Sequence, residues 1–265
     1  MAFGYIVWSI VPVIIAVAFS FNAGASRSVW QGFSLQWWVG GGDSLLHNSV
    51  YLDALIHSFT LAAFDILLVV PIGVALAFFL SRWHGRSSGP VAFVASLPLV
   101  MPELILAVSL FFLFSHVLRV VKLGTGAQTI AQVTFSLPFV IIITRGRLAS
   151  ISKELEEAAV DLGATAFETI RLVMLPLLEP AIVASAIVAF AVSIDDFVVT
   201  EYMSASSATQ TVPILIYNTA RGNATPALNA TASVLAICTL LGVGCGGLAY
   251  MLLSRRRAMV KPDAA

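Results

Sequence analysis

Charged residues are scarce in this sequence. Only 11% of its 265 residues are Asp, Glu, Lys or Arg, while 59% are hydrophobic. A soluble domain carries roughly a quarter charged residues, so a soluble fold of this size would lack the charge to cover its surface. The shortage excludes an ordinary water-soluble domain and favours a chain whose solvent is lipid. The formal net charge is zero and no basic stripe is present, so we expect no nucleic-acid partner.

Cysteine and histidine are also rare. Cys238 and Cys245 lie in one apolar run, where a helix would separate them by roughly 10 Å, too far for a disulfide. The four histidines lack the spacing of metal ligands. We find no Gly-Lys-Ser/Thr phosphate loop, no His-Glu-x-x-His and no Gly-x-Ser-x-Gly motif. We therefore predict no catalytic residues, no metal site and no cofactor bound by this chain.

Long apolar runs dominate the sequence instead. Each is long enough, or nearly so, to cross about 30 Å of hydrocarbon as a helix. Backbone groups in lipid must be satisfied within the segment, which predicts helices. We expect an all-α integral membrane protein, with about six transmembrane helices in a single transmembrane domain over residues 1–265. The predicted spans lie near 4–22, 54–81, 91–118, 128–145, 179–200 and 230–254.

The placement of Lys and Arg indicates the orientation. With six spans and both termini in the cytoplasm, ten basic residues fall inside and four outside, as the positive-inside rule requires. We predict a multi-pass protein of the bacterial cytoplasmic (inner) membrane with cytoplasmic N- and C-termini. The inside residues are Arg82, Arg86, Arg145, Arg147, Lys153, Arg171, Arg255, Arg256, Arg257 and Lys261, and the outside residues are Arg27, Arg119, Lys122 and Arg221.

The longest predicted cytoplasmic connection, 148–178, has the composition of a short surface helix. Ser152 can cap its start, and Glu156 and Glu157 fall in the first turns, where the helix dipole favours negative charge. Gly163 then permits a turn. Insertion into a groove on another protein and an ordinary interfacial helix remain open alternatives. We expect one small apolar face, made of Ala158, Ala159 and Leu162.

This connection resembles the EAA loop of ABC-importer permeases. That pattern runs Glu-Ala-Ala, three residues, Gly, nine residues, Ile, one residue, Leu-Pro. Here Glu157 begins it, Gly163 has the required spacing, Val173 replaces Ile, and Leu175 and Pro176 end it. The resemblance implies a coupling helix that docks on an ATP-binding subunit. The residues assigned to coupling are Glu156, Glu157, Ala158, Ala159, Asp161, Leu162 and Gly163.

Four acidic residues fall within predicted spans, where an ionised carboxylate costs roughly 2.5–3.5 kcal/mol at the bilayer centre. Such residues usually face the bundle interior or a pathway, so we interpret them as lining a pathway for a cation. An internal hydrogen bond between helices is the alternative for each. Adjacent helical residues point about 100° apart, so one member of the Asp-Asp pair is expected to bond to a neighbouring helix. The four are Asp65, Glu103, Asp195 and Asp196.

Two small features predict local helix geometry. Pro98 and Pro102 are expected to break the third span beside Glu103. Gly242 and Gly246 form a small-xxx-small pair, which favours close packing of the last span.

The wider sequence is similar to the spermidine/putrescine branch of this permease family, and within it to the second permease subunit. The similarity is carried by the stretch 193–204, SIDDFVVTEYMS, by Pro102-Glu103 and by Thr211 to Pro213. It implies a type I ABC importer permease fold and a polyamine substrate. Related permeases carry thiamine, iron, opines or phosphonates, and these remain alternative substrates.

The resemblance also implies the partners. Two ATP-binding subunits would use ATP and Mg, a second homologous permease subunit would complete the pathway, and an extracellular or periplasmic binding protein would deliver the solute. The chain itself is then a transport subunit and not an enzyme. A secondary carrier would show two related halves with interrupted helices. A membrane enzyme would need a metal cluster or a nucleophile-base set.

Overall fold

The structure is a computed structural model that describes residues 2–26, 29–82, 88–221 and 225–258. Over these residues the regular elements are helices, and the strand-like pairing is one isolated bridge between Asn22 and Phe33. This confirms the all-α prediction. The predicted basic positions Arg27, Arg86 and Lys261 lie outside the described residues.

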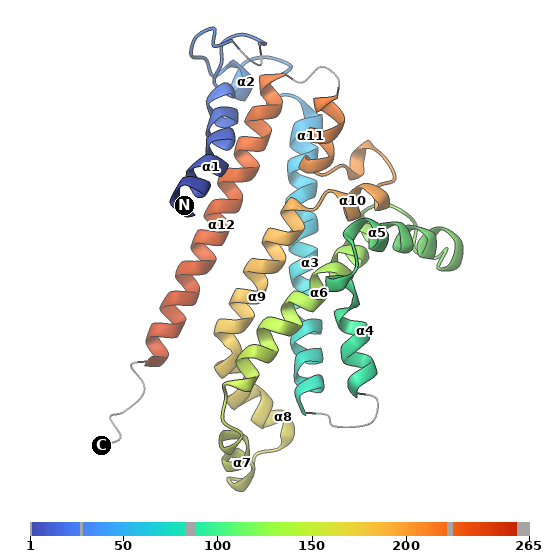
Figure 1. The fold of residues 1–265 in the computed structure, drawn as a ribbon, viewed down its shortest axis with the longest axis vertical. Coiled ribbons are helices and arrows are strands. Elements are labelled where there is room, and N and C mark those ends of the chain that lie inside the picture. Colours follow the sequence, from blue (N-terminus) through green and yellow to red (C-terminus); the bar gives the residue numbers. More distant parts are fainter. Residues whose placement is uncertain (1, 27–28, 83–87, 222–224, 259–265) are drawn as a thin grey trace.

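Four helical stretches in the described chain are long and apolar enough to cross a membrane, and they run along one another in a tall bundle (Figure 1). Helix α6 contacts α3 and α9, and α9 also contacts α12. The four stretches are α3 (Ser49–Arg82), α6 (Thr125–Ala149), Ala166–Asp195 with α9 (Leu175–Asp195) as its main part, and Pro226–Leu252 within α12 (Pro226–Ala258).

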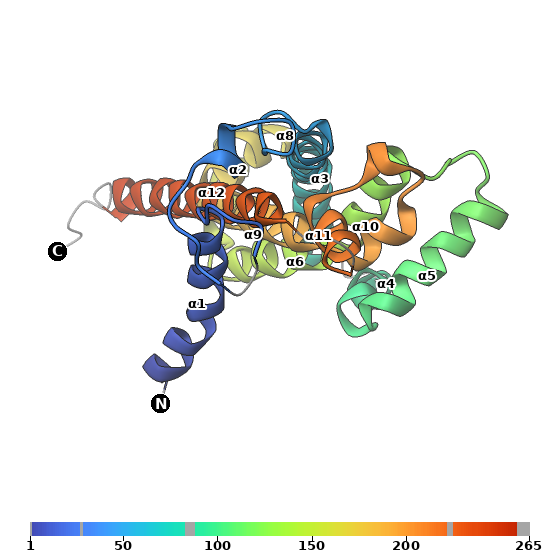
Figure 2. The ribbon, with the colours of Figure 1, turned by 90° about the horizontal axis from the view of Figure 1, so that it is seen from above.

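A bent helix pair is a further candidate span in the described chain. Helices α4 (Ser88–Val100) and α5 (Glu103–Phe112) are bent by 111° at their junction, and Figure 2 shows α5 running outward from the side of the bundle. Pro102 has φ −53° and ψ 130°, so the backbone leaves the helix there. The predicted break beside Glu103 is confirmed at Pro102, whereas Pro98 lies inside α4 and does not break it, and the predicted span 91–118 is two helices at an angle.

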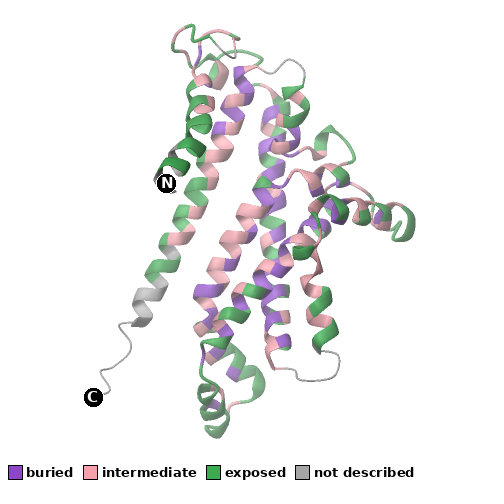
Figure 3. Cartoon of the chain, in the orientation of Figure 1, coloured by how far each residue is buried: buried purple, intermediate pink, exposed green. Residues whose placement is uncertain are grey.

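Helix α1 (Ala2–Phe19) occupies the first predicted span, and its apolar stretch Trp8–Phe19 is shorter than the four long ones. It packs on α12 at the margin of the bundle (Figure 1). Exposed residues run along α1 and along the outer length of α12 (Figure 3). Many of them are large and apolar, including Trp8 and Leu240, which is what a lipid-facing surface requires.

Glycines allow the closest helix contacts. A Cβ added to Gly73 of α3 would lie 2.5 Å from Cγ1 of Val140 in α6. A Cβ at Gly246 of α12 would lie 2.5 Å from Cγ1 of Ile187 in α9, and one at Gly242 would also be crowded. The predicted close packing of the last span is therefore confirmed.

Short elements join the long helices. Their bounds are Gln36–Val39 (α2), Leu113–Val117 (a π-helical turn), Glu154–Asp161 (α7), Ala166–Glu168 (α8), Thr169–Met174 (a second π-helical turn), Val198–Met203 (α10), Ser207–Thr209 (a 3₁₀ turn) and Val212–Ala220 (α11).

Candidate substrate pathway and coupling segment

Helix α7 projects from one end of the bundle, beyond the ends of α3, α6 and α9 (Figure 1). The backbone N–H of Glu154 donates to Oγ of Ser152 at 3.2 Å, so Ser152 caps the start as predicted. Three glutamates, Glu154, Glu156 and Glu157, lie in the first turn, where the positive end of the helix dipole stabilises them.

A glycine turn ends α7. Gly163 has φ +87°, a conformation that L-residues with a Cβ rarely adopt, and its N–H donates to the carbonyl of Val160 at 2.8 Å. The next helix starts at once, because Thr165 and Glu168 form a capping box. The backbone N–H and the hydroxyl of Thr165 both donate to Oε2 of Glu168, at 2.8 Å and 2.7 Å. The connection is therefore a defined helix-turn-helix.

The predicted single apolar face on α7 is wrong. Ala159 is buried against the chain's own helices, whereas Ala158 and Leu162 are exposed and Leu162 retains 90% of its accessible surface. Residues 158 and 162 lie four apart and share a helix face, while 159 is rotated by about 100°. The face available to another protein thus holds Ala158 and Leu162, with Glu157 and Asp161 also exposed.

Glu156 faces its own chain. Its carboxylate forms an ion pair with Arg82, the last residue of α3, and both side chains are about three-quarters buried, with 25% and 29% exposed. The residues assigned to coupling therefore divide into two groups. Glu156 and Ala159 attach α7 to the bundle, and the other five are exposed.

The Asp-Asp pair lies at the far end of α9 from α7 (Figure 1). Asp196 leaves the helix with φ −66° and ψ 126°, which ends the predicted span 179–200 at Asp195. Its two carboxylate oxygens accept the N–H of Val199 at 3.2 Å and the N–H of Thr200 at 2.9 Å. Asp196 therefore caps α10 and is buried, whereas Asp195 is exposed.

Glu103 lies against this junction. It is the first residue of α5, and its carboxyl group lies close to that of Asp196. The break at Pro102 makes this approach possible, because it starts α5 at Glu103 and turns it towards α10, which α5 contacts. Glu103, Asp195 and Asp196 thus belong to one junction, and the exposed one, Asp195, is accessible to a cation.

Asp65 is placed elsewhere. It is fully buried in α3, where Oδ2 accepts the hydroxyl of Ser136 in α6 at 3.0 Å. This is the alternative considered for each acidic residue, an internal hydrogen bond that joins two helices. The structure therefore does not group Asp65 with the other three.

Gln128 has a positioning role that the sequence analysis missed. Its amide donates to the carbonyls of Thr200 at 3.1 Å and Thr209 at 2.8 Å, and its Oε1 accepts Nε2 of His57 at 2.8 Å. Gln128 thereby ties α6 to α3 and to the segment that carries α10. A pattern in the sequence could have found it, since Gln128, Gln132 and Ser136 recur every four residues on one face of an apolar span.

Sequence comparison finds relatives of this chain. Residues 69–259 match the family described as binding-protein-dependent transport system inner membrane component. The spermidine/putrescine transport system permease protein PotC of Escherichia coli (strain K12) is 32% identical over 245 residues, which cover 92% of this chain and 89% of PotC. The putrescine transport system permease protein PotI of the same strain is 33% identical over 250 residues, covering 92% and 86%.

Solved structures share the architecture. A chain of a bacterial ABC transporter that imports the acidic polysaccharide alginate matches with a TM-score of 0.70 at 15% identity, covering 99% of this chain and 95% of that one. A chain of the MetNI methionine ABC transporter matches with a TM-score of 0.61 at 19% identity, covering 77% and 94%. At these identities the likeness shows the fold alone.

Proposed function

Because the chain belongs to the family of binding-protein-dependent transport system inner membrane components, we propose that it is the permease subunit of an ATP-driven importer for a small cationic solute. Its fold is the type I ABC importer permease fold that the sequence predicted. PotC and PotI belong to polyamine transport systems, so spermidine or putrescine is the proposed solute. Thiamine, iron, opines and phosphonates are the alternatives.

The observation that carries the proposal is the exposed face of α7. A permease that another subunit drives needs a rigid element outside the membrane, and α7 is anchored by Glu156 and turned by Gly163. Leu162 is an unpaired apolar side chain at its end, as expected of an anchor for a pocket on a partner. We assign this face to the ATP-binding subunit.

The acidic junction supports a cationic substrate. Asp195 is exposed, and its neighbour in the chain, the buried Asp196, lies close to Glu103. A polyamine carries several ammonium groups, and each donates hydrogen bonds that carboxylates accept. Asp195 is the residue proposed to contact the solute, with Asp196 and Glu103 setting the local charge and geometry. Asp65 is assigned to helix packing.

Helix α9 connects the two regions. It runs from the coupling segment to Asp195 over 21 residues, or roughly 31 Å of helical rise. A rigid helix of that length transmits a shift of its α7 end to the acidic junction. Closure of two ATP-binding subunits, which use ATP and Mg, would thus reorient the junction from one side of the membrane to the other. This chain supplies no ATPase site in the proposed cycle.

The proposed assembly has a second, homologous permease subunit and an extracellular or periplasmic binding protein that delivers the solute. The chain would lie in the bacterial inner membrane with both termini in the cytoplasm. The α7 end then faces the cytoplasm, where ATP is available.

Uptake into proteoliposomes that hold the complete complex tests the function. We expect ATP-dependent accumulation of radiolabelled spermidine or putrescine when the binding protein is present, and no accumulation with a non-hydrolysable ATP analogue. Accumulation driven by a proton gradient without ATP would instead establish a secondary carrier. ATP-dependent uptake of thiamine, iron, an opine or a phosphonate, with none of either amine, would refute the polyamine assignment.

A further inference from the structure

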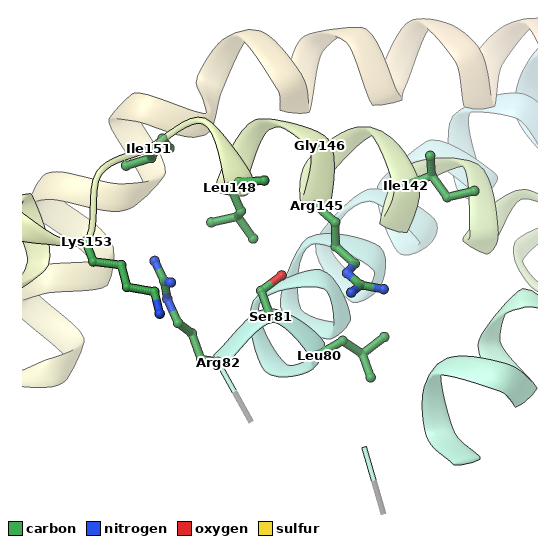
Figure 4. A pocket seen from close by; sticks show the side chains of 10 residues that line it. Leu80, Ser81, Arg82, Ile142, Arg145, Gly146, Leu148, Ile151 and Lys153 are labelled. Carbon is green, nitrogen blue, oxygen red and sulfur yellow. The ribbon is translucent and has the colours of Figure 1, made fainter. Parts of the chain in front are cut away.

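A basic pocket of about 760 Å³ lies at the α7 end of the bundle, between the ends of α3 and α6 and the segment that leads to α7. Figure 4 shows three basic side chains around it. Arg82 belongs to α3, Arg145 belongs to α6, and Lys153 is the residue directly before α7. Apolar side chains complete the lining, among them Leu80 and Ile142. The pocket thus combines positive charge with an apolar wall.

Part of this charge is not balanced within the described chain. Arg82 pairs with Glu156, which consumes one positive charge. Arg145 and Lys153 are exposed, and in the described part of the chain no carboxylate forms an ion pair with either. Figure 4 shows Lys153 beside Arg82 and Arg145 on the other side of Ser81, so positive charge is spread around the cavity. The lining therefore favours an anionic occupant.

Gly146 lines the pocket and has free space around its Cα. It lies inside α6, its φ is not positive, and a Cβ added there would meet nothing within 4 Å. Neither backbone conformation nor close packing within the chain requires glycine here, although glycine in a helix interior costs about 1 kcal/mol relative to alanine. Since Gly146 lines the pocket, a side chain at this position would project towards the space that the occupant needs.

We propose that this pocket binds the headgroup of an anionic phospholipid, with its phosphodiester held by Arg145 and Lys153. Arginine and lysine both bind phosphate oxygens, and basic pockets between membrane helices are known to bind such headgroups. The assignment concerns a lipid site and is independent of which solute the protein transports.

The depth of the pocket fits a headgroup. Helix α6 has 25 residues, so it rises roughly 37 Å, against about 30 Å for the hydrocarbon core and 40–45 Å with the headgroup regions. Arg145 lies one turn before the end of α6 and therefore reaches the polar boundary. The apolar wall at Leu80 and Ile142 suits the glycerol and upper acyl carbons, which a free phosphate ion lacks.

Occupancy would stabilise the coupling segment. Lys153 directly precedes α7 and Arg145 lies on α6, so a headgroup bound to both reinforces the short connection between these two helices. The bound headgroup acts beside the ion pair of Arg82 with Glu156 and lowers the freedom of α7 to shift.

Native mass spectrometry of the purified complex tests the proposal directly. The complex is delipidated and titrated with phosphatidylglycerol, phosphatidylcholine or inorganic phosphate. We expect tight retention of phosphatidylglycerol and weak retention of phosphatidylcholine. Equal retention of the two lipids would overturn the proposal. Displacement of phosphatidylglycerol by millimolar phosphate would also overturn it, because the site would then be one for a free anion.

Three variants localise the binding. Arg145→Gln/Lys153→Gln is expected to weaken phosphatidylglycerol binding on the order of twentyfold, since each basic residue near an anionic headgroup contributes roughly fivefold. Arg119→Gln/Lys122→Gln removes the same charges at exposed positions in the connection between α5 and α6 and should leave binding unchanged. Gly146→Leu keeps all charges and should block the pocket sterically, with Gly146→Ala as its folding control.

If both double variants lose phosphatidylglycerol binding equally, the binding depends on general surface charge and the proposed site is wrong. If the Arg145/Lys153 variant fails to fold, Gly146→Leu decides, because unchanged lipid retention in it would place the lipid elsewhere. These measurements need no ATP and no solute, so a failure of the transport proposal does not affect them.

Discussion

The carboxylate of Glu156 in α7 is paired with the guanidinium of Arg82 at the end of α3. The contact joins the coupling segment to the longest helix of the bundle. Among the described residues, this ion pair attaches α7 to the bundle. Glu156 therefore stabilises the fold of its own chain.

Breaking this pair should loosen α7 without unfolding the protein. Arg82→Gln and Glu156→Gln are each expected to lower ATP-driven uptake severalfold, because α7 would transmit less of the movement of its partner. Since both side chains are about three-quarters buried, removal of one partner should lower the free energy of unfolding by about 1–3 kcal/mol. The double variant should be no worse than either single one. Additive losses in uptake and in the thermal midpoint would contradict the pairing.

Leu162 should be an anchor for the ATP-binding subunit. Leu162→Ser removes an apolar side chain that retains 90% of its surface in this chain, so the isolated permease should keep its stability. A buried apolar anchor typically contributes 1–2 kcal/mol or more, which predicts about tenfold weaker co-purification with the ATP-binding subunit. Val120→Ser is the matched control, because Val120 is 95% exposed in the connection between α5 and α6. Equal co-purification of the two variants would place docking elsewhere.

Substitutions of Asp195 and Asp196, at the end of α9, should have different effects, one on uptake and the other on stability. Asp195→Asn is expected to reduce uptake of a polyamine severalfold with no change in stability, because Asp195 is exposed and makes no cap. Asp196→Ala should lower the free energy of unfolding by about 1 kcal/mol, since the N–H groups of Val199 and Thr200 lose their acceptor. Asp196→Asn keeps a capping side chain and should restore most of that stability. Normal amine uptake in Asp195→Asn would remove this residue from the pathway.

Asp65 should matter for stability and not for substrate. Asp65→Ala is expected to lower the free energy of unfolding by about 1–3 kcal/mol, because Ser136 would lose its acceptor in a buried site. Asp65→Asn retains an acceptor and should cost less. Thermal unfolding in detergent and the KM for uptake separate the two roles. A raised KM for the amine in both variants, with an unchanged thermal midpoint, would return Asp65 to the pathway.

The turn at Gly163 should depend on glycine. Its φ of +87° places a Cβ against the following carbonyl, so Gly163→Ala is expected to cost about 1–2 kcal/mol locally and to lower coupled ATPase activity. Gly163→Asn should be milder, because asparagine enters positive φ more readily. Gly126→Ala, at a helical glycine with nothing within 4 Å of an added Cβ, is the neutral control. Identical activity of the Gly163→Ala variant and this control would show that the turn is not needed.

Patterns local in sequence were predictable. The scarcity of charge and the long apolar runs determined an all-α membrane fold, and Pro102 determined the break in the third span. The spacing that starts at Glu157 identified the proposed coupling segment, and Gly163 predicted the turn that the structure shows there. Each depends on properties of neighbouring residues, such as hydropathy, a missing N–H or a missing Cβ, so the chain alone carries the information.

Only the tertiary structure decided which residues meet. Glu103 reaches Asp196 because α5 turns by 111° against α4. Asp65 lies apart from these two residues, because its position on α3 faces Ser136. The rotation of α7 separates Ala159 from Leu162, and the ends of α3 and α6 place Arg82 and Arg145 around one pocket. Helix rotation and crossing are set by side-chain packing between distant segments, and a single sequence holds that information only in the sum of many weak contacts.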